Sequence, residues 1–380
     1  MEFKKEETLK IMSYNILAQS LISDSLHITE EQAKNISYLN VDYRNDKIFQ
    51  KINELHPDIF LFQEYEHNGK LNRKFKENNF SYEILYKKRP GNHQEGCAIG
   101  FDKKKFKLEY YCSLEFRTEN QKNNNNNYNK YNNYKKSQNN SIYNKENVAI
   151  FLLLQSYKTS FYYLVICSHL LFNCSRGDIK LGQIYQIIQS ALLIKSYYSS
   201  YNITTIFGAD LNSTPNSAIY EYITSKLLDV EYMNKANLSG QTNKSYKSQS
   251  SLGDVNYQWY EEIINTYPKF KDYNIVLISK NKKKYKNNYN RNDDEDYDKG
   301  LILKNKMVMK SFYKEKNGKE PSMTSLSTSF KGTFDFLFYN TNLNLNINNV
   351  LNIPNISFDI PDKDNPSDHL PLFVEFNIHN

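Results

Sequence analysis

Two polar side chains, Asp210 and Asn212, follow the apolar, β-branched run at residues 203–207 and its Gly208. Successive side chains of a strand alternate between its faces, so residues two apart point the same way. The two therefore present a carboxylate beside an amide just past the end of a predicted strand. Gly208 allows another backbone to approach closely, and Pro215 prevents the strand from continuing. The pattern predicts a chemical site at a sheet edge, with a simple Asx turn as the structural alternative.

Polar residues also mark the ends of other predicted strands. Three stand at the end of an apolar run and two stand at or near the start of one: Asn15, Glu64, His169, Asp335 and His369. In a sheet with antiparallel members, the start of one strand lies beside the end of its neighbour. These side chains are therefore expected to meet Asp210 and Asn212 at one edge of one fold.

These residue types suit phosphoryl chemistry that is assisted by a metal ion. Glu64 supplies an anionic oxygen and Asn15 a neutral one. With water and substrate phosphate oxygens, they form the kind of site that Mg²⁺ prefers, with Mn²⁺ able to substitute. The cation would stabilise charge that builds on a phosphoryl group. Asp368 is expected to be an outer-shell partner of the cation.

The remaining side chains have expected roles in such a reaction. Asp210 is placed to orient or deprotonate an attacking water, and Asn212 to hold a phosphate oxygen. His169 and His369 can each donate to the oxygens of a pentacovalent phosphorus. Asp335 could hold the ring of His369 in one tautomer, which makes a histidine a dependable donor.

Structural explanations and other kinds of site were weighed against this hypothesis. A lone glutamate at a strand end is more often a surface residue, but no structural need explains all seven positions together. The other histidines are interpreted as surface or core residues: His27, His56, His67, His93 and His379. The sequence has no HExxH and no zinc-type cysteine pair, no Gly-x-Ser-x-Gly elbow and no P-loop.

Hydrophobic periodicity predicts an α/β chain. Helices are expected at residues 43–55, 71–76, 178–192 and 217–224, with Asp178 as a candidate N-cap. Four consecutive apolar residues at 59–62 indicate a strand that is covered on both faces. Further strands are expected at residues 8–15, 82–86, 96–101, 148–155, 161–169, 203–210, 332–339 and 370–376.

Length and composition bound the organisation. The 380 residues are interpreted as a single domain that low-complexity insertions interrupt at about 119–147, 239–251 and 280–300. A net charge of +7 favours a polyanionic partner such as nucleic acid. The four cysteines are expected to be free thiols in a reducing compartment. The N-terminus shows no secretory signal, and residues 161–172 are too short to span a bilayer. An intracellular location, cytoplasmic or nuclear, without a membrane partner is therefore expected.

Taken together, the motifs resemble those of the endonuclease/exonuclease/phosphatase superfamily, in order, over about residues 8–230 and 320–378. They are Ser-Tyr-Asn15, Gln63-Glu64, Ser-His169, Gly-Ala-Asp210-Leu-Asn212, Phe334-Asp335 and Ser-Asp368-His369. The resemblance implies a four-layer, two-sheet α/β sandwich that carries a metal-dependent phosphoesterase site. The superfamily also contains abasic-site DNA nucleases and lipid or inositol phosphatases, so the fold alone does not fix the substrate.

Within the superfamily, residues 13–19 and 325–338 resemble the carbon catabolite repressor type deadenylases and the Angel proteins. Residues 89–99 and 169–181 lean toward Angel. Arg89, Arg176 and Lys180 in these stretches are assigned to substrate binding. The resemblance implies that the ring of Phe330 stacks on an adenine. Cys174 departs from the family, which often has proline near the base pocket.

The sequence favours a Mg²⁺-dependent phosphodiesterase on RNA 3′ ends, namely a 3′→5′ exoribonuclease of poly(A) deadenylase type. The alternative is an RNA 2′,3′-cyclic phosphatase, which the Angel-like stretches imply. A DNA-repair endonuclease and an RNA-binding module without catalysis are weaker alternatives. The expected partner is a single-stranded RNA 3′ end. No leucine-rich-repeat region precedes the match, so docking into the large deadenylase complex by that route is not expected.

Overall fold

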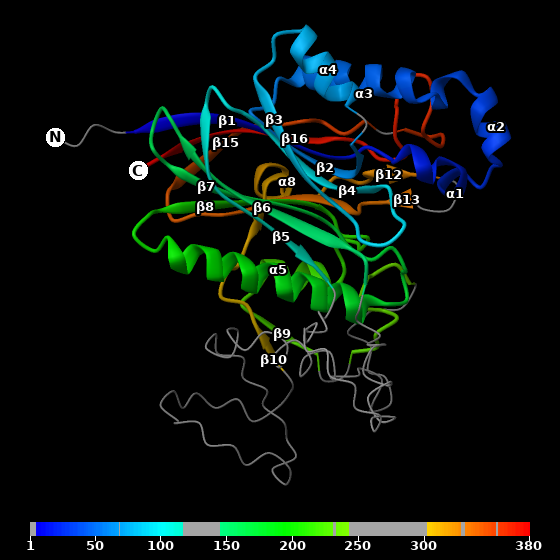
Figure 1. The fold of residues 1–380 in the computed structure, drawn as a ribbon. Helices are drawn as coiled ribbons and strands as arrows, with labels where there is room; N and C mark the ends of the chain where they lie inside the picture. The colour runs from blue at the N-terminus through cyan, green and yellow to red at the C-terminus, as the bar shows by residue number, and fades with distance from the viewer. Residues whose placement is uncertain are drawn as a thin grey trace, which may run out of the picture.

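Two six-stranded sheets that face each other form the centre of the molecule (Figure 1). The computed structural model describes residues 5–67, 69–116, 145–230, 233–242, 302–327, 331–354 and 356–380. Within these residues, helices lie on the outer sides of both sheets (Figure 1). The prediction of an α/β fold with two packed sheets is confirmed.

The first sheet contains β1 (Glu6–Asn15), β2 (Ile59–Glu66), β3 (Tyr82–Lys88), β4 (Glu95–Asp102), β15 (Asn344–Val350) and β16 (Leu372–His379). Its strand order is β15-β16-β1-β2-β4-β3. Strand β1 is parallel to β2 and antiparallel to β16. The first and last strands of the chain therefore lie side by side in the middle of this sheet.

The second sheet contains β5 (Phe106–Glu115), β6 (Val148–Ser156), β7 (Tyr162–His169), β8 (Ile203–Asp210), β11 (Lys310–Ser311) and β14 (Asp335–Asn340). Its strand order is β11-β14-β8-β7-β6-β5. Strand β8 is parallel to β7 and antiparallel to β14. Two short pairs stand apart, β9 (Leu227–Asp229) with β10 (Ile302–Lys304) and β12 (Ser325–Leu326) with β13 (Lys331–Gly332).

The described helices are α1 (Ile22–Leu26), α2 (Glu30–Asn35), α3 (Val41–Leu55), α4 (Lys70–Glu77), α5 (Gly177–Tyr197), α6 (Ala218–Thr224) and α8 (Phe312–Asn317), with 3-10 turns η1 (Gln19–Leu21) and η2 (Ser37–Leu39). The helices do not all lie in the outer layers, because Phe312 and Tyr313 of α8 are part of the apolar cluster between the two sheets. Figure 1 shows α3 and α4 over the first sheet and α5 beside the second. Among the described residues, no helix is both long and apolar enough to cross a bilayer.

Strand β2 is covered by apolar side chains on both of its faces. Ile59 and Leu61 point into the apolar cluster between the two sheets. Phe60 and Phe62 point the other way, into the cluster beneath α3 and α4. Because alternate side chains face opposite layers, a strand covered on both faces needs a continuous apolar run. The predicted two-sided burial of residues 59–62 is confirmed.

Gly208 of β8 lies where the two sheets approach closely. A Cβ atom at this position would lie 2.8 Å from Ser13 Oγ and 3.1 Å from Leu61 Cδ2. Replacing Gly208 with alanine is therefore expected to lower the free energy of unfolding by about 1–3 kcal/mol, because the added methyl group overfills the core. Urea denaturation followed by circular dichroism measures the change. An unchanged unfolding midpoint and slope would contradict the close approach.

The start of α5 differs from the prediction. Its N-cap is Arg176, without a side-chain capping bond, and Asp178 lies inside the helix. Arg176 donates from Nε and Nη2 to the two carboxylate oxygens of Asp178, at 3.0 and 2.8 Å. The prediction that Asp178 is the N-cap is wrong, because this bidentate pair holds the carboxylate.

Most of the predicted insertions at 119–147, 239–251 and 280–300 lies outside the described residues. The described residues at the edges of these predicted insertions are partly buried in the folded domain. Asn147 is buried, and buried Ser239 donates from Oγ to the backbone oxygen of Cys174 at 2.7 Å. Residues 145–147 and 239–242 therefore contribute to the folded domain. The structure also adds elements that the sequence analysis did not predict: β5, β15, α1, α2 and α8.

Candidate active site

Strands from both sheets end at one rim of the sandwich. The registers of the second sheet place His169 of β7 beside Asp210 of β8, and Asp210 beside Asp335 of β14. In the first sheet, Asn15 at the end of β1 pairs with Gln63 of β2, one residue before Glu64. Strand pairing alone thus brings these polar ends close together.

Asn15 connects the acidic groups of the two sheets. Its Nδ2 donates to Glu64 Oε1 at 3.0 Å and to Asp210 Oδ2 at 3.1 Å. Its Oδ1 accepts from the backbone N–H of Leu17 at 3.1 Å. A backbone N–H can only donate, so the amide oxygen must face Leu17. Asn15 therefore holds two carboxylates together, and its role as an oxygen ligand stays a prediction, because one accepted hydrogen bond leaves the amide oxygen a second lone pair.

Glu64 lies on an irregular part of β2 with a φ of 57°. A positive φ is uncommon for a residue with a side chain, and bulges of this kind re-aim side chains near active sites. Its Oε2 accepts from the backbone N–H of Ala18 at 3.0 Å. Burial raises the pKa of the Glu64 carboxyl group, His169 lowers it, and Asp368 raises it further. The carboxylate is thus held close to a second acid.

His369 and Asp335 form a buried pair. The Nδ1 of His369 lies 2.8 Å from Asp335 Oδ2, and its Nε2 lies 3.8 Å from Asp210 Oδ2. Burial alone would lower the pKa of His369, but Asp335 and Asp210 raise it well above its usual value. Asp335 thus holds Nδ1 of His369, and Nε2 of the ring faces Asp210.

Asn212 fixes the second histidine. Its Nδ2 donates to the backbone oxygen of Leu170 at 3.1 Å and lies 2.9 Å from His169 Nε2. Because an amide nitrogen only donates, His169 Nε2 accepts, and Nδ1 carries the proton 3.9 Å from Glu64 Oε1. Asn212 therefore orients His169, and a phosphate oxygen that contacts this amide must replace one of these bonds.

The loop that carries Asp368 is attached to the end of β1. Ser367 Oγ donates to the backbone oxygen of Asn15 at 2.7 Å and lies 3.4 Å from Asp368 Oδ1. The other carboxylate oxygen, Oδ2, accepts from Ser25 Oγ at 2.7 Å. Asp368 is only 8% exposed. Its carboxylate is thus directed into the same cluster as Glu64.

These groups line a cavity of about 390 Å³. One side carries Glu64, His169, Asp210, Asn212, Asp368 and His369. The other sides carry apolar and polar residues that the sequence analysis did not assign to the site: Leu17, Leu21, Asp24, Ser25, His27, Phe172, Ser325, Ser327 and Phe334. His27, interpreted from the sequence as a surface or core residue, is exposed and also lines the cavity. Its segment showed no regular pattern that could have placed it there.

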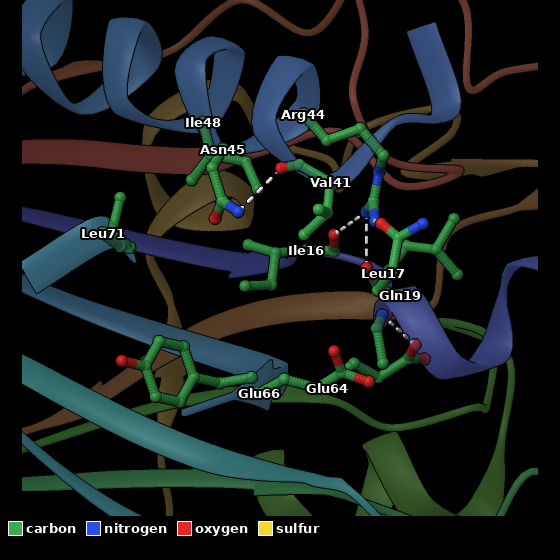
Figure 2. A pocket seen from close by; sticks show the side chains of 12 residues that line it. Ile16, Leu17, Gln19, Val41, Arg44, Asn45, Ile48, Glu64, Glu66 and Leu71 are labelled. Atoms are coloured by element: carbon green, nitrogen blue, oxygen red, sulfur yellow. Dashed lines mark hydrogen bonds between the residues drawn. The ribbon is translucent and has the colours of Figure 1, made fainter. Parts of the chain in front are cut away.

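Arg44 of α3 is a second residue that the sequence analysis missed. Its guanidinium donates to Gln19 Oε1 at 2.9 Å and to the backbone oxygens of Ile16, Leu17 and Pro366. Figure 2 shows it between α3 and the loop after β1, near Glu64. Burial lowers the pKa of Arg44, whereas Tyr14, Asp368 and Glu64 raise it. The buried cation joins the loops that carry the acids and offsets part of their charge.

The four predicted substrate-binding residues have different environments. Arg89 lines the cavity and donates from Nη1 to Glu95 Oε1 at 2.6 Å. Arg176 pairs with Asp178 and does not line the cavity, and Lys180 is fully buried. The structure does not support a substrate contact for either. Phe330 lies outside the described residues.

Lys180 instead supports the turn that carries Asn212. Its Nζ donates to the backbone oxygen of Asn212 and to Gln241 Oε1, the latter at 3.1 Å. Burial lowers the pKa of Lys180 to about 7, although Asp210 opposes the shift. Lys180 therefore supports the backbone at Asn212.

The donor groups at this rim suit a hard divalent cation. Asp210, Asp335 and His369 each offer a ligand atom, and these atoms lie within 4.8 Å of one another. Buried Asp335 Oδ1 has no hydrogen-bond partner among the described residues. Glu64 and Asp368 supply two further carboxylates to the same cavity. Carboxylate oxygens are the ligands that Mg²⁺ and Mn²⁺ take in proteins. The site can thus bind a divalent cation.

Known proteins with related sequences carry Angel and carbon catabolite repressor names. No family model matches this sequence. Protein angel homolog 2 of Bos taurus is 29% identical over 240 residues, which cover 62% of this chain and 40% of that protein. Carbon catabolite repressor protein 4 homolog 6 of Arabidopsis thaliana is 26% identical over 262 residues, covering 63% and 30%. The match spans less than half the length of these relatives.

Solved structures show the same fold. ANGEL2, a 2′,3′-cyclic phosphatase, in complex with adenosine-2′,3′-vanadate matches with a TM-score of 0.71 and 23% identity, covering 100% of this chain and 99% of that one. The human Nocturnin catalytic domain matches with a TM-score of 0.56 and 16% identity, covering 99% and 97%. An endonuclease/exonuclease/phosphatase from Bacteroides vulgatus matches with a TM-score of 0.52 and 13% identity, covering 97% of this chain and 98% of that one. The chain therefore shares the fold of these solved structures and is similar in sequence to the Angel and carbon catabolite repressor 4 proteins.

Proposed function

We propose that the protein is a divalent-cation-dependent phosphoric ester hydrolase that removes 2′,3′-cyclic phosphates from RNA ends. The observation that carries the proposal is the convergence of Glu64, Asp210, Asp368, His169 and His369 on one cavity, with Asp335 bonded to the ring of His369. The relationship to ANGEL2, named as a 2′,3′-cyclic phosphatase, supports this substrate over the deadenylase reaction that the sequence favoured. The net charge of +7 is compatible with a polyanionic substrate.

The size of the cavity supports an RNA end as the substrate. Its volume of about 390 Å³ is near the lower end of small-ligand pockets, which span roughly 300–1,000 Å³. Leu17, Leu21 and Phe172 give the cavity an apolar surface suited to a nucleoside. Arg89 at the cavity supplies a positive group for a phosphate or base edge.

Each hydrolytic step adds a water oxygen to phosphorus and breaks one ribose P–O bond. Opening the ring leaves a phosphomonoester, and a second water releases inorganic phosphate. Asp210 would accept the proton of the water, and His369 would donate a hydrogen bond or proton to the oxygens whose charge increases. Asp335 keeps the His369 ring oriented.

Glu64 and Asp368 would hold the cation, with Asn15 keeping Glu64 and Asp210 together. A cation bound there would stabilise negative charge on the phosphoryl oxygens. Mg²⁺ and Mn²⁺ both suit these ligands. His169, oriented by Asn212, would donate from Nδ1 on the same side as Glu64.

A 3′→5′ exoribonuclease acting on poly(A) is the second candidate. The relationship to the carbon catabolite repressor 4 homologues supports it. The predicted adenine contact depends on Phe330, which the structure does not describe. The DNA-repair endonuclease and the RNA-binding module without catalysis have no comparable support.

One end-group experiment separates these functions. Labelled RNAs that end in a 2′,3′-cyclic phosphate, in a poly(A) 3′-hydroxyl, or in a non-adenine 3′-hydroxyl are incubated with protein and Mg²⁺. Loss of the terminal phosphate without chain shortening is expected only for the first RNA. Stepwise shortening of the poly(A) RNA, with the cyclic end left intact, would replace the proposal with the deadenylase function.

Replacing Lys180 with methionine is expected to lower kcat about tenfold and to leave KM unchanged. Lys180 holds the backbone of Asn212, and such supporting partners of a site contribute about 10–100-fold. Steady-state kinetics on the cyclic-phosphate RNA measures both constants. Lys195→Met is the matched control, because Lys195 is a partly buried lysine of the same helix that bonds to Asn340 instead. A higher KM with unchanged kcat would indicate direct substrate contact by Lys180.

A further inference from the structure

Ser25 links the short helix α1 to one of the candidate cation ligands. Its Oγ donates to Asp368 Oδ2 at 2.7 Å, and the two residues are 343 positions apart in the chain. A hydroxyl–carboxylate bond of this length is charge-assisted and stronger than a bond between neutral groups. Ser25 is half-buried and lines the same cavity as Asp368.

The hydroxyl of Ser25 is the main fixed contact of the Asp368 side chain within the described ranges. Ser367 Oγ lies 3.4 Å from Asp368 Oδ1, which is the limit of a hydrogen bond, and makes its shorter bond to the backbone oxygen of Asn15. Oδ2 is thus held by Ser25, whereas Oδ1 keeps a lone pair for a cation or its bound water.

The segment that runs from the end of β1 through α1 contacts both acids. The backbone N–H of Ala18 donates to Glu64 Oε2 at 3.0 Å, and Ser25 at the other end of the segment donates to Asp368. Leu17, just before Ala18, and Leu21, between Ala18 and Ser25, line the cavity. One continuous segment therefore fixes two carboxylates that belong to different loops and also forms one side of the substrate cavity.

We propose that Ser25 is a positioning residue for the cation site. Its hydroxyl holds Asp368 in the orientation that faces Glu64. Without the hydroxyl of Ser25, the Asp368 side chain would sample other rotamers, and cation binding would have to restrict that motion. The inference rests on the proposed function, because it requires Glu64 and Asp368 to hold the cation. Loss of a supporting partner of a metal ligand commonly weakens metal affinity by about 10–100-fold.

Mn²⁺ binding, measured by electron paramagnetic resonance of the free ion, tests the proposal without any substrate. Ser25→Ala is expected to weaken binding about tenfold. Ser25→Thr, which keeps a hydroxyl, is expected to restore most of the affinity. Ser23→Ala, on the same helix but not lining the cavity, is the matched control and should bind Mn²⁺ like the wild type. Melting temperatures without cation establish that each variant is folded, and Ser25→Cys replaces Ser25→Ala if the latter is not.

A double-mutant cycle with Asp368→Asn tests whether Ser25 acts through Asp368. If it does, Ser25→Ala has no further effect on Mn²⁺ affinity in the Asp368→Asn background. An equal effect in both backgrounds, or wild-type affinity in Ser25→Ala, would overturn the inference and leave the cation site intact. A wild-type protein that binds no Mn²⁺, or whose binding survives Glu64→Ala, would instead overturn the cation assignment in the proposed function.

Discussion

Replacing Asp210 with asparagine is expected to lower kcat on cyclic-phosphate-ended RNA by about a thousandfold, or about 4 kcal/mol. The amide cannot accept a proton from the attacking water. The substitution also removes the negative charge that Asn15 Nδ2 contacts at 3.1 Å. Two donors face the side chain at position 210, namely Asn15 Nδ2 and the backbone N–H of Asn212, and the new NH₂ group conflicts with one of them. Single-turnover rates at saturating Mg²⁺ measure the chemical step directly.

The comparison needs a control for charge loss and folding. Asp42→Asn removes a carboxylate from the surface end of α3, where Asp42 pairs with Lys70, and should leave the rate unchanged. Circular dichroism melting shows whether Asp210→Asn remains folded. A folded Asp210→Asn protein that keeps more than about a tenth of the wild-type rate would remove Asp210 from the role of general base.

Replacing His369 with glutamine is expected to lower kcat by about a hundredfold to a thousandfold. In the proposed reaction, the imidazole, whose pKa Asp335 and Asp210 raise, would donate from Nε2 to the reacting oxygens, and a glutamine amide cannot transfer a proton there. Asp335→Asn should have a smaller effect, because Asp335 acts through its 2.8 Å bond to His369. Rates of both single variants and of the double variant on the same RNA measure the coupling.

The rate of the double variant, compared with that of His369→Gln, shows whether Asp335 acts through His369. If Asp335 acts only through His369, the double variant is no slower than His369→Gln alone. Losses that multiply would show that Asp335 has an independent role, such as binding a cation with Asp210. His379→Gln, near the far end of β16, is the control for a histidine outside the site and should be fully active.

Much of the fold could be predicted because local pattern and long-range pairing agree. The run at 59–62 is apolar on both faces because β2 lies between a helix layer and the second sheet. The polar strand ends meet because β7, β8 and β14 pair in register at their tips. Such ends are recognisable in a sequence because burying a polar side chain inside a strand costs free energy unless the side chain is hydrogen-bonded.

The parts of the site that could not be predicted depend on contacts between segments without periodicity. Ser25 reaches Asp368 across 343 positions, and Arg44 reaches Pro366 across 322. In the sequence, Arg44 is one polar residue on a helix with apolar spacing, which is the pattern of a surface arginine. Only the folded loops show that its guanidinium is buried beside the acids.

Residue type was also a weak guide to the direction of a side chain. Lys180 and Arg176 carry the charge that a phosphate needs, but one supports the backbone of Asn212 and the other pairs with Asp178. The amide of Asn15 also makes contacts that its residue type does not reveal, namely to Glu64, to Asp210 and to the N–H of Leu17. Local hydrogen-bond partners, which the sequence does not reveal, decide these orientations.

The most direct test of the central claim measures cation-dependent turnover with and without Glu64. Labelled RNA that ends in a 2′,3′-cyclic phosphate is incubated with wild-type protein or Glu64→Ala, in Mg²⁺ and in EDTA. The wild type is expected to release the terminal phosphate only in Mg²⁺, and Glu64→Ala to lose this activity. Equal turnover by the two proteins, or wild-type turnover that EDTA leaves unchanged, would contradict a cation-dependent phosphoesterase built around Glu64.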